Sequence, residues 1–281
     1  MPAAGVSRRL ATNYLPAPML GRLRRVKAKV DAGRFDSRVV RHSYGGDELQ
    51  VRIVSRYGDR YDRDWPELAE IAFLRGAGLR PGARVFNLGA NHGVIAMMLA
   101  KVVGESGRVV AVEACAADIE AARESARLNG LDQMECLHAA VARSEGTAAF
   151  GVNGEVDDGS GKFGRERVEA VSIDGLARRY GTPDVVFMDV EGYEGEALAG
   201  ARETLDARPD WFVEVHGDEA ITRYGGSTDE VVGEFDSRGY ECHWAADMLG
   251  TGPDGRLVSR TTFGPLHGRP EAGRFFLIAL G

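Results

Sequence analysis

The stretch Val85–Gly93, with the sequence VFNLGANHG, decides the fold of this chain. An apolar run ends here in a glycine turn, and residues 94–103 continue with the apolar spacing of a helix. A strand, a tight turn and a helix begin a doubly wound α/β sheet, in which ligands bind at the carboxyl ends of strands. Gly89 permits the turn and leaves room for a ligand near the main chain. Asn91 and His92 interrupt a GxGxxG spacing, which disfavours a pyrophosphate site and favours a bulkier ligand without phosphate.

Strands and helices alternate outward from this stretch. Strands are expected at residues 84–88, 108–113, 134–138, 184–189 and 211–215, and helices at 94–103, 118–128 and 195–205. Two short strands, at 147–152 and 168–172, flank a glycine-rich loop at 154–164, and strands at 240–244 and 274–280 form an antiparallel pair. This alternation indicates βαβ units. The expected fold is α/β and Rossmann-like, with a mostly parallel seven-stranded sheet, helices on both faces and an antiparallel C-terminal strand.

An N-terminal accessory region, residues 1–80, is expected before a catalytic domain at 81–281. Residues 19–30 place apolar side chains on one helical stripe and basic side chains elsewhere. Such a helix packs on its own domain, joins sister subunits in a homo-oligomer, or lies on a membrane surface. We favour packing on protein.

A hairpin and a short helix follow in the same region. Residues 39–44 and 48–54 alternate as strands do and flank Gly45-Gly46-Asp47, a turn sequence typical of a hairpin. Pro66 suits the first turn of a helix, which Gly76 and Gly78 would end.

Composition limits the classes of function. The chain has 281 residues, 44% hydrophobic and 27% charged, as in an ordinary globular protein. Its three cysteines are far apart and form no CxxC pair, which indicates reduced thiols and a cytoplasmic protein. No apolar run is long enough for a membrane span. Outside residues 1–30, 28 basic residues stand against 42 acidic ones, so nucleic acid is a poor match as a partner.

Acidic side chains and a histidine stand at the ends of the expected strands. Glu113 ends the second strand, 24 residues after Gly89, where a carboxylate can accept hydrogen bonds from both hydroxyls of a ribose. Asp189 follows a buried strand, and with Glu191 and Glu194 it could hold a hard cation, orient a substrate or cap the next helix. We assign no metal ligand, because these three side chains need not point the same way. His216, after the fifth strand, is a candidate base or a packing residue.

Taken together, these residues resemble the FkbM-like family of S-adenosylmethionine-dependent methyltransferases over roughly residues 65–216. The matching pieces are residues 86–93, 109–113, 129–130, 172–176, 188–194 and 214–216. By this resemblance, Asn87, Gly89 and Asn91 would bind the methionine end of the cofactor, Glu113 its ribose, and Cys115 with Ala140 its adenine edge. Asp189 would face the methyl group and the acceptor.

The chain departs from the family pattern at two places. The family usually has Asp where this chain has Asn87, which puts an ionic contact to the cofactor's ammonium in doubt, although the Asn carbonyl still accepts a hydrogen bond. Ala114 and Cys115 follow Glu113, where the family tends to have Pro.

The resemblance implies methyl transfer from S-adenosylmethionine to a small hydroxylated molecule, a sugar or a secondary metabolite. His216 and Asp189 are the candidate catalytic residues, since a hydroxyl acceptor must lose its proton. A carboxylate or peptide acceptor is an alternative within the same fold. A nicotinamide-dependent oxidoreductase is disfavoured by the absent GxGxxG, and a non-catalytic scaffold by the intact Gly89, Glu113 and Asp189.

Overall fold

The structure, a computed structural model, describes residues 35–150, 166–246, 249–251, 256–259, 262–265 and 273–281. The helix expected at 19–30 and the glycine-rich loop at 154–164 lie outside the described residues.

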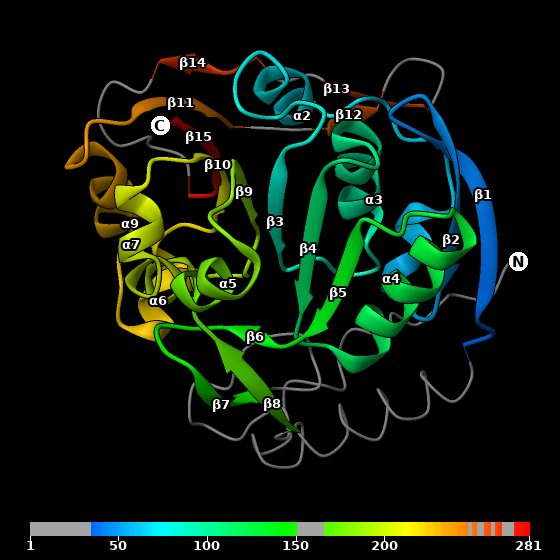
Figure 1. Cartoon of the computed structure of the whole chain (residues 1–281), viewed down its shortest axis with the longest axis horizontal. Coiled ribbons are helices and arrows are strands. Elements are labelled where there is room, and N and C mark those ends of the chain that lie inside the picture. Colours follow the sequence, from blue (N-terminus) through cyan, green and yellow to red (C-terminus); the bar gives the residue numbers. More distant parts are fainter. Residues whose placement is uncertain (1–34, 151–165, 247–248, 252–255, 260–261, 266–272) are drawn as a thin grey trace, which may run out of the picture.

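One large sheet forms the centre of the molecule (Figure 1). Its strands, in spatial order, are β14 (Gly264–Pro265), β11 (Glu241–Ala245), β15 (Phe275–Leu280), β10 (Asp210–Val215), β9 (Val185–Met188), β3 (Arg84–Leu88), β4 (Arg108–Glu113) and β5 (Met134–His138). The five strands from β10 to β5 are parallel, and β15 runs antiparallel to both β10 and β11. The mostly parallel α/β fold and the antiparallel pair near the C-terminus are thus confirmed. To the seven expected strands the structure adds the two-residue strand β14 at one edge.

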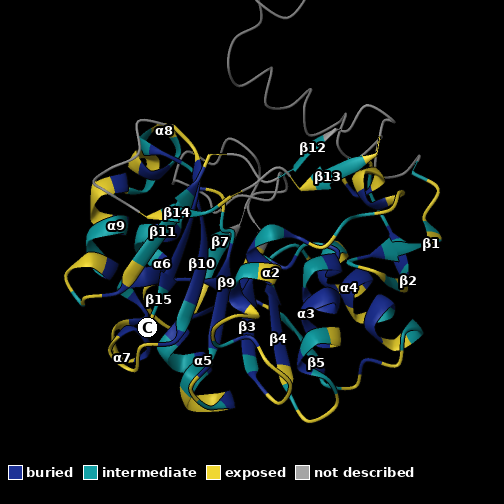
Figure 2. Ribbon diagram, turned by 90° about the horizontal axis from the view of Figure 1, so that it is seen from above, coloured by how far each residue is buried: buried dark blue, intermediate teal, exposed yellow. Residues whose placement is uncertain are grey.

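Helices cover both faces of this sheet because successive strand residues point to opposite sides. Val85 belongs to one hydrophobic core, with α2 (Ala69–Leu74), α3 (Val94–Val103) and α4 (Ala116–Leu128). Phe86 belongs to the other core, with α5 (Ile173–Tyr180), α6 (Glu194–Ala199), α7 (Arg202–Asp206), α8 (Asp218–Ile221) and α9 (Thr228–Asp236). Strands buried on both faces are continuous apolar runs, as the sequence has them, and Figure 2 shows their dark, buried ribbons between the two helical layers.

The order of the sheet reverses between β3 and β9. The chain builds β4 and β5 outward on one side of β3, and β9 and β10 on the other side. Loops at the carboxyl ends of β3 and β9 therefore diverge and leave a crevice, which is where doubly wound sheets bind their ligands.

Two expected elements differ in detail. The strands expected at 147–152 and 168–172 lie outside the central sheet, as β7 (Gly146–Phe150) and β8 (Glu166–Val171) of a separate three-stranded sheet with β6 (Ala140–Val141). The single helix expected at 195–205 is divided into α6 and α7 around Gly200, where a Cβ atom would lie 2.5 Å from the Ala142 carbonyl oxygen. A side chain at this position would thus collide with the neighbouring backbone, which accounts for the glycine at the end of α6.

The expected hairpin is present, as β1 (Arg38–Tyr44) and β2 (Asp47–Ile53) joined at Gly45-Gly46. It packs against α4: the Gln50 backbone N–H donates to Asn129 Oδ1 and the Arg52 N–H to Ser125 Oγ, each at 2.9 Å. Its buried side chains join the core that α3 and α4 form on one face of the sheet.

Two 3-10 helices and a pair of short strands complete the described chain. A 3-10 helix, η1 (Tyr57–Tyr61), follows the hairpin, and α2 begins at Ala69 rather than near Pro66. A second 3-10 helix, η2, spans Thr222–Tyr224, and β12 (Leu249–Thr251) pairs with β13 (Leu257–Ser259). Within the described segments, no helix has both the length and the hydropathy that crossing a bilayer requires.

Candidate active site

A cleft of about 1130 Å³ opens at the carboxyl ends of β3, β4, β9 and β10. Six of the seven predicted site residues line it: Asn87, Gly89, Asn91, Glu113, Ala140 and Asp189. His216 is not among the residues that line this cleft, although its ring contacts three side chains that are. The topology thus gathers residues from four separate strand ends around one cavity.

Gly89 is required by the protein backbone itself. It has a φ of 83°, and a Cβ atom there would lie 1.8 Å from the carbonyl oxygen of Asp189. The Asp189 N–H donates to the Leu88 carbonyl at 3.0 Å, so the ends of β3 and β9 are in direct contact. The close approach of Asp189 is therefore one reason for this glycine, and the room for a ligand that the sequence suggested stays a prediction.

Glu113 is held in a fixed orientation at the end of β4. One carboxylate oxygen accepts from the Asn91 N–H at 2.9 Å, and the other accepts from the Cys115 N–H at 2.7 Å. Burial raises the pKa of Glu113, and these backbone hydrogen bonds oppose that shift. The remaining lone pairs of the carboxylate are available to the two hydroxyls of a ribose.

The Asn91 side chain is used within the protein. Its Oδ1 accepts from the His92 N–H at 2.9 Å, lies 2.6 Å from His92 Nδ1, and accepts from the Tyr61 hydroxyl at 3.3 Å. His92 is fully buried, and burial lowers its pKa. A neutral His92 that donates from Nδ1 to Asn91 can accept the Val54 N–H at Nε2, 3.5 Å away. Asn91 and His92 thus join the glycine turn to the chain after the hairpin.

Asn87 offers an unused acceptor. The residue is 4% exposed and lines the cleft, and its Oδ1 is buried without a hydrogen-bond partner among the described residues. Such an atom costs free energy unless a ligand satisfies it. An ammonium group could do so, as the methionine end of S-adenosylmethionine would. The Glu113 carboxylate and the apolar Ala139 and Ala140 line the same cleft. Together with Asn87, they fit the ribose, the adenine and the ammonium of that nucleoside.

Carboxylates surround His216 at the ends of β9 and β10. His216 Nδ1 lies 2.8 Å from Glu194 Oε1, and Nε2 lies 3.4 Å from Glu191 and from Glu214 and 3.7 Å from Asp189. Burial lowers the pKa of His216, but hydrogen bonds to Glu191 and Glu194 outweigh it and raise the pKa to about 11. Burial and the charge of Glu214 raise the pKa of Asp189. Arg274 contacts the same cluster, with its Nε 2.9 Å from Glu214 Oε1.

A third set of cleft residues, from the segment between the hairpin and α2, had no role in the sequence-based expectation. Its arginine and aromatic members that line the cavity are Arg56, Tyr57, Arg60, Tyr61 and Trp65. The Arg60 guanidinium lies 3.6 Å from the centre of the Tyr57 ring, and the Tyr61 and Trp65 rings are 5.3 Å apart. The signal in the sequence is the density of aromatic and arginine residues between 56 and 65, which is high for a connecting loop.

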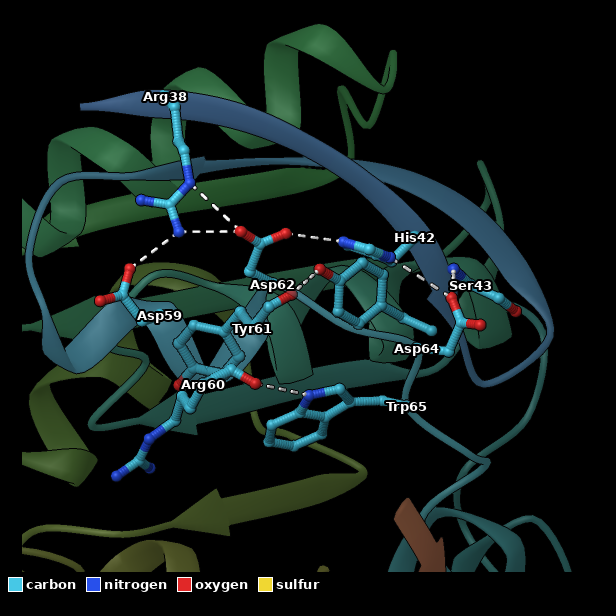
Figure 3. Close-up of polar contacts among 10 residues, drawn as sticks. Arg38, His42, Ser43, Asp59, Arg60, Tyr61, Asp62, Asp64 and Trp65 are labelled. Atoms are coloured by element: carbon cyan, nitrogen blue, oxygen red, sulfur yellow. Dashed lines mark hydrogen bonds and ion pairs between the residues drawn. The ribbon is translucent and has the colours of Figure 1, made fainter. Parts of the chain in front are cut away.

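Polar contacts hold this segment, residues 54–65, against the hairpin (Figure 3). Arg38 reaches Asp59 and Asp62 at 2.8 Å each, and Asp62 also lies 2.8 Å from His42 Nε2. The Tyr44 hydroxyl donates to the Tyr61 carbonyl. We call residues 54–65 the cap segment, because they form one wall of the cleft opposite the strand ends.

Comparisons with known proteins agree with this geometry. The family described as "Methyltransferase FkbM domain" matches residues 87–242, more than half of the chain. No curated protein is similar enough in sequence to count as a relative.

Several solved structures are similar to the chain at low sequence identity. A SAM-dependent methyltransferase from Aquifex aeolicus is 17% identical, with 76% of this chain and 89% of that one covered and a TM-score of 0.42. A SAM-dependent O-methyltransferase from Thermotoga maritima is 12% identical, covering 86% and 77%, with a TM-score of 0.45. The O-methyltransferase TomG from Streptomyces achromogenes, solved with SAM, is 13% identical, covering 79% and 85%, with a TM-score of 0.44.

The sheet order and the cleft at its switch point define a Rossmann-like fold of the α/β class with a candidate ligand site at the strand ends. The chain belongs to the FkbM domain family of methyltransferases. The resemblance found in the sequence is thereby confirmed.

Proposed function

We propose that this methyltransferase methylates a hydroxyl oxygen of a small molecule, a sugar or a secondary metabolite. The observation that supports this proposal is the position of Asp189. Its carboxylate lines the cleft at the end of β9, next to the turn at Gly89 and beside the acidic Glu214 of β10. A carboxylate at this point can take the proton that a hydroxyl must lose when it is methylated.

The cleft has two chemically different halves. Asn87, Glu113 and Ala140 form the half that suits the methyl donor. To the second half we assign Tyr57 and Trp65 of the cap segment and Phe212 and Phe276 of the sheet, which also line the cleft. Aromatic walls bury the apolar faces of sugar rings and fused-ring metabolites, so the second half suits the acceptor.

The donor supplies a methyl group on a sulfonium, which is a very good leaving group. The chain's own residues then have two tasks. The first is orientation of the acceptor oxygen against the methyl carbon, which alone is worth about 7–11 kcal/mol. The second is proton removal: the acceptor O–H proton passes to Asp189, and the electron pair left on the oxygen forms the new C–O bond. The electron pair of the C–S bond leaves with the sulfur, which becomes a neutral thioether. Asp189 then returns the proton to solvent.

Asp189 is a better candidate for the base than His216. Asp189 lines the cleft, whereas His216 does not, and both ring nitrogens of His216 lie next to carboxylates. We therefore give His216 a positioning role, in which its ring fixes the carboxylates of Asp189 and Glu214.

The test is a screen of hydroxylated sugars and metabolites with S-adenosylmethionine that carries a labelled methyl group, followed by single-turnover rates for Asp189→Asn. We expect Asp189→Asn to lower the rate of methyl transfer about 10²–10⁴-fold, since the variant lacks the base. Affinity for the demethylated product of the donor, measured by calorimetry, should change much less. The matched control Asp184→Asn lies at the opposite end of β9 and should keep full activity.

Two results would contradict the proposal. A carboxylic acid acceptor is already ionised and needs no base. If the labelled methyl group is found in a methyl ester, and Asp189→Asn turns over at the normal rate, the carboxylate alternative is favoured. Absence of donor binding by the folded protein would remove the assignment of the cleft to S-adenosylmethionine.

A further inference from the structure

Three side chains from adjacent strands converge on one point beside the cleft. Asp189 follows β9, while Glu214 lies in β10 and His216 follows it, and each offers one ligand atom within 4.8 Å of the others. The register of the parallel strands causes this convergence, because Met188 and Val213 are paired neighbours and the next residues continue side by side. Only Asp189 belongs to the trio of carboxylates that the sequence suggested as a possible cation site.

The histidine is held as metal-binding histidines are held. Its Nδ1 donates to Glu194 Oε1 at 2.8 Å, which fixes the ring and directs Nε2 toward Asp189 and Glu214. Glu194 is fully buried and also accepts the Gly192 N–H at 3.0 Å, so its carboxylate is held in this orientation. A carboxylate behind a histidine in this way is the usual outer partner of a metal-ligating imidazole.

Two acidic oxygens in this cluster have no hydrogen-bond partner. Asp189 Oδ1, 3.7 Å from His216 Nε2, is inaccessible to solvent and accepts no hydrogen bond from a described residue. The same holds for Oε2 of Glu194, whose side chain is 0% exposed. Buried acceptors without donors are costly, and a cation at His216 Nε2 would satisfy Asp189 Oδ1, whereas Glu194 lies on the Nδ1 side of the ring.

The charges of the cluster are also unbalanced. Asp189, Glu191, Glu194 and Glu214 supply four carboxylates around one imidazole. Arg274 is a neighbouring cation, bound to Glu214 by its Nε, and its side chain is 58% exposed. When all four carboxylates are ionised, Arg274 and a proton on His216 leave two negative charges, and a divalent cation in place of that proton leaves one.

We propose that Asp189, Glu214 and His216 bind a divalent metal ion, with Glu194 as the positioning partner of His216. Two carboxylate oxygens and one imidazole nitrogen suit Mn²⁺, which accepts both kinds of donor, better than Mg²⁺, which prefers oxygen alone. In the absence of metal, a proton on Nε2 occupies the same place. Three protein ligands leave coordination positions open on the side of the cleft, whose wall includes Asp189 and Glu214.

The use of this ion rests on the proposed function, whereas its binding does not. Asp189 offers the ion one oxygen, so its second oxygen remains to take the acceptor proton, as in the proposed function. An acceptor hydroxyl that coordinates the ion would lose that proton more readily and would be fixed beside the donor's methyl group. Molecules that offer a second oxygen next to the hydroxyl, as vicinal diols do, would chelate the ion and would be the preferred acceptors.

The test is a titration of the chelator-treated full-length protein with Mn²⁺, followed by the electron paramagnetic resonance signal of free Mn²⁺. We expect one tightly bound ion per chain. Glu214→Gln should weaken binding at least about tenfold through loss of a charged ligand, and Glu194→Gln about tenfold through loss of the orienting hydrogen bond. Glu203→Gln, an exposed carboxylate on α7 with a 74% exposed side chain, is the matched control and should bind as the wild type does.

Each outcome separates the metal site from the methyltransferase assignment. Donor binding, measured by calorimetry with chelator present, reports on the cofactor half alone. If the protein binds the donor but neither Mn²⁺ nor Zn²⁺, the metal proposal is overturned and the proposed function stands. The metal proposal is also overturned if Mn²⁺ binds equally to the wild type, Glu214→Gln and His216→Ala. Thermal unfolding of each variant establishes that it is folded, and His216→Ala replaces Glu214→Gln if that variant does not fold.

Discussion

Glu113 illustrates how the protein can fix in advance a side chain that we propose as a nucleoside ligand. Its two oxygens are fixed by the N–H groups of Asn91 and Cys115, which belong to the loops after β3 and β4. The carboxylate therefore couples the two loops beside the proposed ribose site, and little side-chain entropy would remain to be lost when a ribose binds. The shape of this half of the cleft depends on the charge and the length of one residue.

Substitution of Glu113 should weaken the binding of the methyl donor. We expect Glu113→Ala to lower the affinity for S-adenosylmethionine and its demethylated product by about 1–3 kcal/mol, because two charge-assisted hydrogen bonds are lost. Calorimetry with both nucleosides measures this change. Glu120→Ala, an exposed carboxylate on α4, is the control and should bind normally. Unchanged affinity in Glu113→Ala would remove Glu113 from the cofactor site.

At the scale of the element, the short helix α2 has an unusual property. Glu70 is 0% exposed, and neither of its carboxylate oxygens has a hydrogen-bond partner among the described residues. Burial raises its pKa to about 8. The protonated form is thus the one that suits the folded protein at neutral pH, and ionisation of Glu70 opposes the packing of α2.

This arrangement predicts how stability changes with pH. The pKa of Glu70 is higher in the folded chain than in the unfolded chain. Its contribution to the free energy of unfolding is therefore complete below the unfolded pKa of about 4.3. This contribution is lost as the pH rises toward 8, with a slope of up to about 1.4 kcal/mol per pH unit. We expect Glu70→Gln to match the wild type near pH 5 and to have a larger free energy of unfolding at pH 8, as urea denaturation measures. Glu67→Gln, on the surface before α2, should show no such difference. A parallel pH profile for wild type and Glu70→Gln would show that Glu70 ionises normally.

The sequence predicted buried elements better than exposed ones. The bounds of β3 and β4 agree with the expectation residue for residue, because a strand buried on both faces is a continuous apolar run. The η1 helix was not expected, since a single 3-10 turn has no apolar period to detect. The division of α6 from α7 depends on the backbone of Ala142, which lies far away in the sequence and so leaves no local signal.

At the scale of the molecule, the candidate site could be predicted only in part. Residues at strand ends, such as Glu113 and Asp189, follow from the topology, which brings parallel carboxyl ends to one edge. The cap segment does not, because its position depends on how the hairpin packs on α4. That packing uses Gln50 and Arg52 against Asn129 and Ser125, contacts between residues more than 70 positions apart.

The boundary near residue 80 between an accessory region and a catalytic domain stays a prediction.

One wall of the cleft thus depends on the contacts that hold the cap segment. Asp62 lies at their centre: it accepts from Arg38 and contacts His42 Nε2, each at 2.8 Å. Hydrogen bonds from His42 and Arg38 lower the pKa of Asp62, so its contribution is present at neutral pH and is lost as the pH falls through that lowered value. The network lies at the surface, where such pairs add little to global stability. Its effect should therefore be local.

We expect Asp62→Asn to loosen the cap segment without unfolding the sheet. Hydrogen exchange should become at least about tenfold faster for the amides of residues 57–61, since local opening is governed by the contacts of that element alone. The amides of β3, which the core buries, should exchange at the wild-type rate, and donor affinity should change little because Asp62 does not line the cleft. Asp36→Asn, an exposed residue just before β1, is the matched control. Equal protection of residues 57–61 in Asp62→Asn and Asp36→Asn would mean that the apolar contacts of Tyr61 and Trp65, rather than the ion pairs, hold this wall of the cleft.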